Sequence, residues 1–166
     1  MEQSIITDIQ RFYPCQEGFE WFKQQPSLEE AWLKCERPEW MLWYLRKKRI
    51  GSLEQFVRIA LFCAKEAQPY VRNKEDSQKA IDAVEAWLNS PTEENRMKCR
   101  DAANATANAA NAAYVAAAYA VYWAEDAAYD ATYAAANAAD YVAAARTEMQ
   151  VKICNYIRDV ISIPFK

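Results

Sequence analysis

Apolar residues recur every three or four positions through the first hundred residues, as they do along one face of a helix. The clearest case follows Ser52, where the apolar positions are Leu53, Phe56, Val57, Ala60, Leu61 and Ala64. A second case, in a helix expected to begin near Asp76, comprises Ile81, Val84, Trp87 and Leu88. These spacings predict amphipathic helices that each turn one side to a shared core.

Serines stand where several such helices should begin. Ser27, Ser52 and Ser90 are each followed three residues later by Glu or Gln, the pattern of a capping box. Pro91 suits the first helical position after Ser90. Thr147 matches the same pattern and is expected to start a last helix that ends before Pro164. These starts, in a chain with only two glycines, predict an all-α fold.

Two further features concern the aromatic residues before residue 50. Pro38 is expected to open a short helix whose residues from Trp40 to Leu45 are all apolar, so this helix should be central. A break at Pro14 separates two clusters of apolar residues, Ile9, Phe12 and Tyr13, then Phe19, Trp21 and Phe22. The tryptophans are assigned to the core. Trp123 is the exception and is expected to be exposed.

The composition changes after residue 100. Residues 101–145 contain 24 alanines and no Lys, Arg, Gly or Pro, and alanine is the strongest helix former. One unbroken helix from Pro91 to Ile163 would be roughly 110 Å long, so this half must fold back, near 123–126, or form a rod. We expect a single domain, 1–166: a helical bundle of short tryptophan-rich helices in 1–100 packed with long alanine- and tyrosine-rich helices in 101–166.

Polar residues of the alanine-rich half fall near one stripe of its expected helices. The plain interpretation is a solvated face that keeps an alanine-rich helix soluble. The alternative is a partner-binding surface, because tyrosines give broad contacts and acids without nearby bases give a negative field. The candidate binding residues are Tyr122, Trp123, Glu125, Asp126, Tyr129, Asp130, Tyr133, Asn137 and Asp140.

The composition argues against catalysis and cofactors. The chain has no histidine, which excludes histidine bases and histidine metal sites, and its two glycines cannot form a phosphate-binding loop. The five cysteines are widely spaced without a CxxC pair, so we expect reduced, mostly buried thiols in a cytoplasmic protein. We therefore expect no enzyme activity, no catalytic residues, no metal and no cofactor.

Charge and hydropathy limit the kinds of partner that the chain is expected to bind. A net charge of −3 is unlike that of a nucleic-acid binder, and the basic run 46–49 suits a solvated helix C-terminus. The chain has no apolar stretch long enough to span a membrane, and its first residues do not resemble a signal peptide. A protein partner is thus the expected one, and close alanine packing would also allow a homodimer.

Two motifs near the N-terminus carry a family resemblance. They are Cys15-x-x-Gly18-x-x-Trp21 and Cys35-x-Arg37-x-x-Trp40-Met41-Leu42-Trp43, with Trp32 between them and an alanine- and tyrosine-rich half after them. With these features the chain resembles the alanine-rich immunity proteins of bacterial polymorphic toxin systems, a family also found in phages. We interpret the signature residues Cys15, Gly18, Trp21, Trp32, Cys35, Trp40 and Trp43 as fold determinants.

The resemblance implies stoichiometric inhibition rather than catalysis. An immunity protein neutralises its toxin by covering the active site or a nearby surface, and the acidic tyrosine-bearing stripe would suit the basic cleft of a nuclease toxin. Two alternatives stay open. A phage-encoded inhibitor of a host defence enzyme, of the anti-CRISPR kind, would need the same surface, and a self-associating structural protein would need only the helices.

Overall fold

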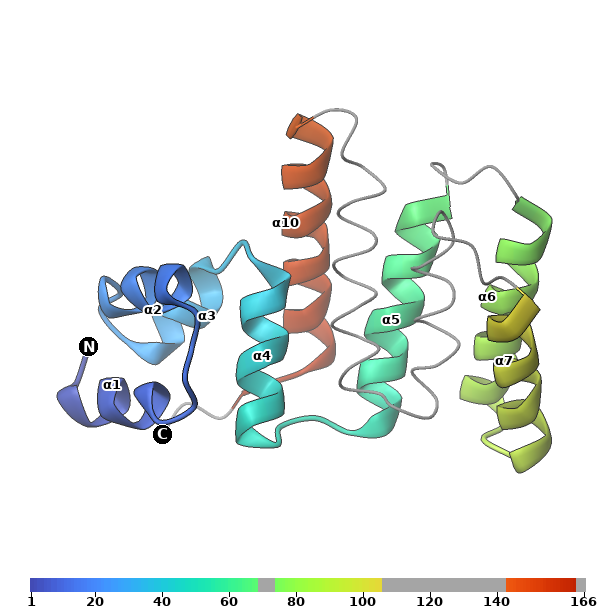
Figure 1. Cartoon of the computed structure of the whole chain (residues 1–166), viewed down its shortest axis with the longest axis horizontal. Coiled ribbons are helices and arrows are strands. Elements are labelled where there is room, and N and C mark those ends of the chain that lie inside the picture. The colour runs from blue at the N-terminus through green and yellow to red at the C-terminus, as the bar shows by residue number, and fades with distance from the viewer. Residues whose placement is uncertain (69–73, 106–142, 164–166) are drawn as a thin grey trace.

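The computed structural model describes residues 1–68, 74–105 and 143–163 (Figure 1), and all regular secondary structure in these ranges is helical. The predicted all-α class is confirmed. The helices are α1 (Gln3–Gln10), α2 (Gln16–Lys23), α3 (Leu28–Lys34), α4 (Pro38–Lys48), α5 (Leu53–Ala67), α6 (Lys74–Asn89), α7 (Glu93–Ala105) and α10 (Ala143–Val160). The break expected near 123–126 lies outside the described residues.

Helix α10, from the end of the described chain, packs between α4 and α5, which come much earlier in the sequence (Figure 1). Helix α6 packs against the other side of α5, and α7 packs against α6. The short helices α1–α3 lie on the side of α4 away from α5. The described helices α4, α10, α5, α6 and α7 therefore form a packed row in that order, and α1–α3 form a smaller group at its end.

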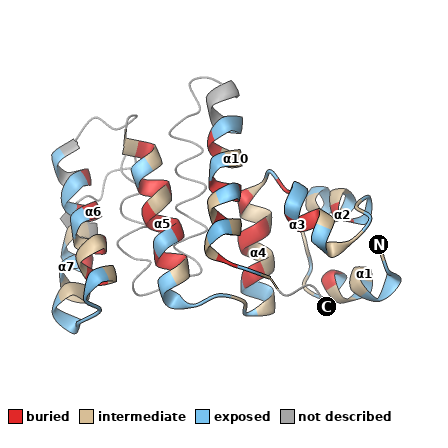
Figure 2. Cartoon of the chain, turned by 180° about the vertical axis from the view of Figure 1, so that it is seen from behind, coloured by how far each residue is buried: buried red, intermediate tan, exposed pale blue. Residues whose placement is uncertain are grey.

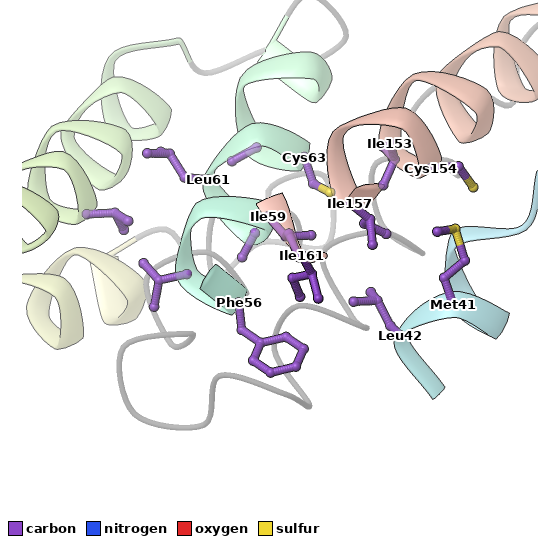
Figure 3. Packing of buried hydrophobic residues seen from close by; sticks show 14 of the residues in the cluster. Met41, Leu42, Phe56, Ile59, Leu61, Cys63, Ile153, Cys154, Ile157 and Ile161 are labelled. Atoms are coloured by element: carbon purple, nitrogen blue, oxygen red, sulfur yellow. The ribbon is translucent and has the colours of Figure 1, made fainter. Parts of the chain in front are cut away.

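The buried side chains form two clusters, and Figure 2 shows the buried stripes along α4, α5 and α10. In the larger cluster, Met41 and Leu42 of α4 point toward the isoleucines of α10, and Ile59 and Cys63 of α5 approach α10 from the opposite side (Figure 3). The smaller cluster contains Ile9, Phe22 and Ala31, one residue from each of α1–α3.

Helix α4 joins the two clusters. Its buried residues Pro38, Met41, Leu42 and Leu45 face one side. Trp43 packs on the smaller cluster, and Tyr44 packs on both. The central position expected for this helix is confirmed, although its aromatic residues Trp40, Trp43 and Tyr44 are only half-buried.

Two of the predicted helix starts are confirmed, because each depends on contacts within four residues. The Ser52 hydroxyl accepts a hydrogen bond from the Gln55 N–H, and the Gln55 side chain accepts one from the Ser52 N–H, at 3.3 and 2.8 Å. Ser27 accepts a hydrogen bond from the Glu30 N–H at 3.1 Å. Leu53, placed by its spacing on the apolar face of α5, is instead 45% exposed at its first turn.

The other two predicted starts are wrong. Ser90 directly follows α6 rather than starting α7, and its N–H donates back to the Ala86 carbonyl of α6 at 3.0 Å. Helix α7 starts at Glu93, and the Thr92 hydroxyl accepts a hydrogen bond from the Asn95 N–H at 3.3 Å. Thr147 lies inside α10, whose described residues begin at Ala143, so Thr147 does not start this helix.

Candidate functional site

A solvent-open cavity of about 360 Å³ lies among α1–α4, in the lower part of the range that small-molecule sites occupy. We call it the aromatic pocket. Its ring-bearing walls are Phe19, Trp21, Phe22, Trp32, Trp40, Trp43 and Tyr44. Ile9 of α1 also lines the pocket, and Gln150 is the described residue of α10 that lines it.

The two sequence signatures meet at this pocket. All seven signature residues, Cys15, Gly18, Trp21, Trp32, Cys35, Trp40 and Trp43, line it. Spacings of three residues bring one signature to a single face of α2, and α4 presents the other signature opposite it. The interpretation of these residues as fold determinants is incomplete, because the same side chains also form the walls of an open cavity.

Gly18 sets the distance between α2 and α4. A Cβ atom at this position would lie 3.2 Å from Cε2 of Trp40 and 3.1 Å from Sγ of Cys15. The indole of Trp40 therefore rests directly on the backbone of α2. One turn further along α2, the ring centroid of Trp21 lies 5.5 Å from that of Trp40, and the two ring planes are inclined at 44°.

A small charged network stands beside the aromatic walls. The Arg37 guanidinium lies 4.8 Å from the Trp40 ring centroid, within cation–π range. Its Nε donates to a carboxylate oxygen of Glu39 at 2.5 Å, and its Nη1 donates to one of Glu17 at 3.3 Å. The Cys35 thiol donates to the Arg37 carbonyl at 3.3 Å, which fixes the turn that leads into α4.

The tryptophans differ in burial more than the sequence indicated. Trp32 and Trp87 are buried, as expected for core residues. Trp21, Trp40 and Trp43 are only half-buried, since one side of each faces the pocket. Their assignment to the core is therefore correct for packing but wrong for full burial, and Trp123 lies outside the described residues.

Four of the five thiols are structural. Cys35, Cys63, Cys99 and Cys154 are buried, as predicted, and Cys15 is exposed at the mouth of the pocket. Burial raises the pKa of the Cys35 and Cys99 thiols to about 11, and it raises the pKa of Cys63 and Cys154 further. At neutral pH these four groups stay protonated and are poor nucleophiles.

Every candidate binding residue of the polar stripe, from Tyr122 to Asp140, lies outside the described residues. The basic run is placed: Arg46, Lys47 and Lys48 form the last turn of α4, as predicted for a helix C-terminus. Lys48 there forms an ion pair with Asp8 of α1 at 2.5 Å.

Among the described residues, no group of three or more Cys, Asp or Glu side chains is arranged to hold a metal ion. None of the helices in 1–68, 74–105 and 143–163 is both long and apolar enough to cross a membrane.

The described residues thus define an all-α protein with an open aromatic cavity at one end of a row of helices. Comparison with known families shows which family the chain belongs to. The chain belongs to a family of unknown function, DUF6931, which matches residues 53–157. Comparison with curated proteins and with solved structures gave no match. The matched stretch starts at the first residue of α5, so every described wall of the pocket except Gln150 precedes it.

Proposed function

We propose that this protein is a non-catalytic inhibitor that binds a protein target, as immunity proteins bind their toxins. The observation that supports this most is the convergence of all seven signature residues on one open aromatic pocket. Half-buried tryptophans in a packed wall are typical anchors of protein interfaces, because they offer a large contact area at little cost in conformational entropy.

The chemistry of the described residues also favours binding over catalysis. The buried thiols are held protonated, and the chain contains no histidine that could activate the exposed Cys15. Glu17 and Glu39 lie at the pocket, but both are already engaged by Arg37. Such groups recognise a ligand more readily than they transfer a proton to it.

The proposed target is an intracellular toxin, with a nuclease as the leading case, and the proposed location is the cytoplasm of a bacterium or of a phage-infected cell. A host defence enzyme is the alternative target, because inhibition of either requires only a stable scaffold with a complementary surface. The polar stripe from Tyr122 to Asp140 remains the proposed acidic contact for a basic cleft.

Affinity capture from a lysate of the source organism at moderate salt tests the proposal. We expect the immobilised protein to retain one stoichiometric toxin, nuclease or defence protein, identified by mass spectrometry and inhibited by the purified chain. The double variant Asp126→Lys, Asp130→Lys should retain less of it while keeping its helix content, because it reverses the charge of the stripe.

Two results would count against this proposal. A captured protein whose activity the purified chain leaves unchanged would argue against inhibition. Capture of a second copy of this chain alone would favour the self-associating structural protein. Equal capture by the double variant would remove the stripe from the contact surface.

A further inference from the structure

We propose that the aromatic pocket is a binding site for an organic cation with an apolar body, such as a quaternary ammonium group. This inference does not depend on the proposed inhibition, since a free cation needs no protein partner. It rests on three properties of the pocket: the identity of its rings, the charge at its rim and its unfilled volume.

The rings supply the main attraction. Trp21, Trp40 and Trp43 line the cavity together with Tyr44, and tryptophan has the strongest cation–π interaction of the aromatic side chains. Trp21 and Trp40 are inclined to each other at 44° rather than stacked. Two inclined rings can each turn a face toward one ligand, which is the arrangement of aromatic cages that hold quaternary ammonium groups.

The chain already places a cation against one of these rings. The Arg37 guanidinium lies 4.8 Å from the Trp40 ring centroid. This contact uses only one ring, and the cavity of about 360 Å³ remains open with Arg37 in place. The Trp40 ring thus already interacts with a cation.

The charge at the rim selects the sign of the ligand. The charged residues among the described lining are two carboxylates, Glu17 and Glu39, and one guanidinium, Arg37, which leaves one negative charge in excess. Glu39 is the more buried partner of Arg37, whereas the Glu17 side chain is 71% exposed and holds Arg37 at a longer 3.3 Å. Glu17 is thus the carboxylate that can turn toward an incoming cation.

The volume limits the size of the ligand. An engineered apolar cavity of about 150 Å³ holds a benzene molecule, so a cavity of about 360 Å³ has room for a trimethylammonium group with a short chain or ring attached. The same chemistry is present in a free quaternary amine and in an alkylated lysine side chain of a protein, and the experiment below distinguishes these two sources.

The test compares two probes of the same shape. Choline carries a trimethylammonium group, and its neutral isostere carries a tert-butyl group in the same place. Each probe is titrated into the full-length protein while the indole N–H signals are followed by NMR. We expect choline to shift the signals of Trp21, Trp40 and Trp43, to leave that of Trp87 in α6 unchanged, and to bind about ten-fold more tightly than the isostere.

Two variants with matched controls locate the effect. Trp21→Leu keeps an apolar wall without the ring, and choline affinity should fall about ten-fold, whereas Phe62→Leu removes a stacked ring of α5 far from the pocket and should change nothing. Glu17→Gln should weaken choline about three-fold and leave the isostere unaffected. The control Glu20→Gln removes an exposed carboxylate of the same helix that pairs with Lys23 instead.

Each outcome decides the proposal. Equal affinity for the two probes would overturn it, because the pocket would then be merely apolar. Absence of choline binding, or a signal shift confined to Trp87, would also overturn it. If choline binds as expected, a short peptide containing trimethyl-lysine is titrated next. Tighter binding of the peptide would assign the site to a protein side chain, and tighter binding of choline would assign it to a free amine.

Discussion

The Arg158 guanidinium, in the last turn of α10, donates from Nε to the backbone carbonyl of Trp32 in α3 at 3.0 Å. The same guanidinium donates to the carbonyl of Cys35, just after α3 ends. The last carbonyls of a helix have no partner within it, and Arg158 satisfies one of those of α3, the carbonyl of Trp32. Arg158 lies one residue beyond the stretch that matches the family, and it holds a wall of the aromatic pocket against α10.

Removal of this connection should loosen α3. We expect Arg158→Ala to lower the free energy of unfolding by about 1.5–3 kcal/mol, the usual contribution of hydrogen bonds to a charged group. Urea denaturation measures the change, and amide exchange in α3 should accelerate. The control Arg58→Ala breaks only an exposed pair with Glu54 within α5, and it should cost no more than about 0.5 kcal/mol. Equal losses in both variants would show that the contact with α3 is unimportant.

The turn between α4 and α5 depends on Gly51. Its φ of +113° is unfavourable for any residue with a side chain, and a Cβ there would lie 2.8 Å from a ring carbon of the buried Phe56. Gly51→Ala should therefore lower the free energy of unfolding by about 1–3 kcal/mol, seen as a lower Tm. Gly18→Ala is the matched comparison, because Gly18 lies in a helix, where alanine is favoured by about 1 kcal/mol.

Gly18→Ala should change Tm little, because the gain in helix propensity should roughly offset the close contact of the new methyl group with Trp40. A Gly51→Ala variant as stable as the unaltered protein would mean that the turn adopts another conformation.

Cysteine alkylation should distinguish the exposed thiol of Cys15 from the four buried thiols. We expect iodoacetamide at pH about 8, near the pKa of an unperturbed thiol, to label the native protein once, at Cys15, because the other four thiols are buried. Mass spectrometry of the peptides identifies the site. Labelling in concentrated urea should reach all five thiols, which controls for reagent access, and rapid labelling of a second thiol in the native protein would contradict the packing around it.

The same thiols predict how stability depends on pH. Burial raises the pKa of Cys35 and Cys99 from 9.0 to about 11. Between these values the unfolded chain loses both protons while the folded protein keeps them, so the free energy of unfolding should fall as pH rises through this window. Below the lower value the two thiols should contribute no slope. Urea midpoints measured as a function of pH test this expectation.

A variant separates these thiols from other groups that titrate at high pH. Cys99→Ala should show a shallower decline, because one of the four buried thiols with a raised pKa is gone, while burial still raises the pKa of Tyr44 in both proteins. An unchanged decline in the variant would assign the slope to other groups.

Local signals predicted the helices well where the relevant contacts are local. Ser52 and Gln55 satisfy each other within one turn, so the sequence alone was sufficient to place the start of α5. The same rule failed at Ser90, because the end of α6 already uses its N–H and the Asn95 side chain donates to the Ala86 and Ser90 carbonyls across the turn. Competition between two adjoining helices is not visible in a capping pattern.

The pocket could not be predicted, although its residues were singled out. The spacing of Cys15, Gly18 and Trp21 is compatible with one helical face, but the position of Trp40 against that face depends on how α2 and α4 pack. Apolar residues of a fully buried wall and of an open pocket look alike in a sequence, since both need aromatic side chains at helical spacing. The stripe from Tyr122 to Asp140 remains a prediction from the sequence alone.

The boundary of the family match at Leu53 also bears on how such a protein can diversify. Among the described residues, the matched stretch contributes Gln150 to the aromatic pocket, and α1–α4 contribute the rest. A substitution at Glu17 alters the rim of the pocket without replacing any residue of the buried cluster that α5, α6 and α10 share. The rim of the pocket can therefore vary in charge while the buried residues of the helical row stay the same.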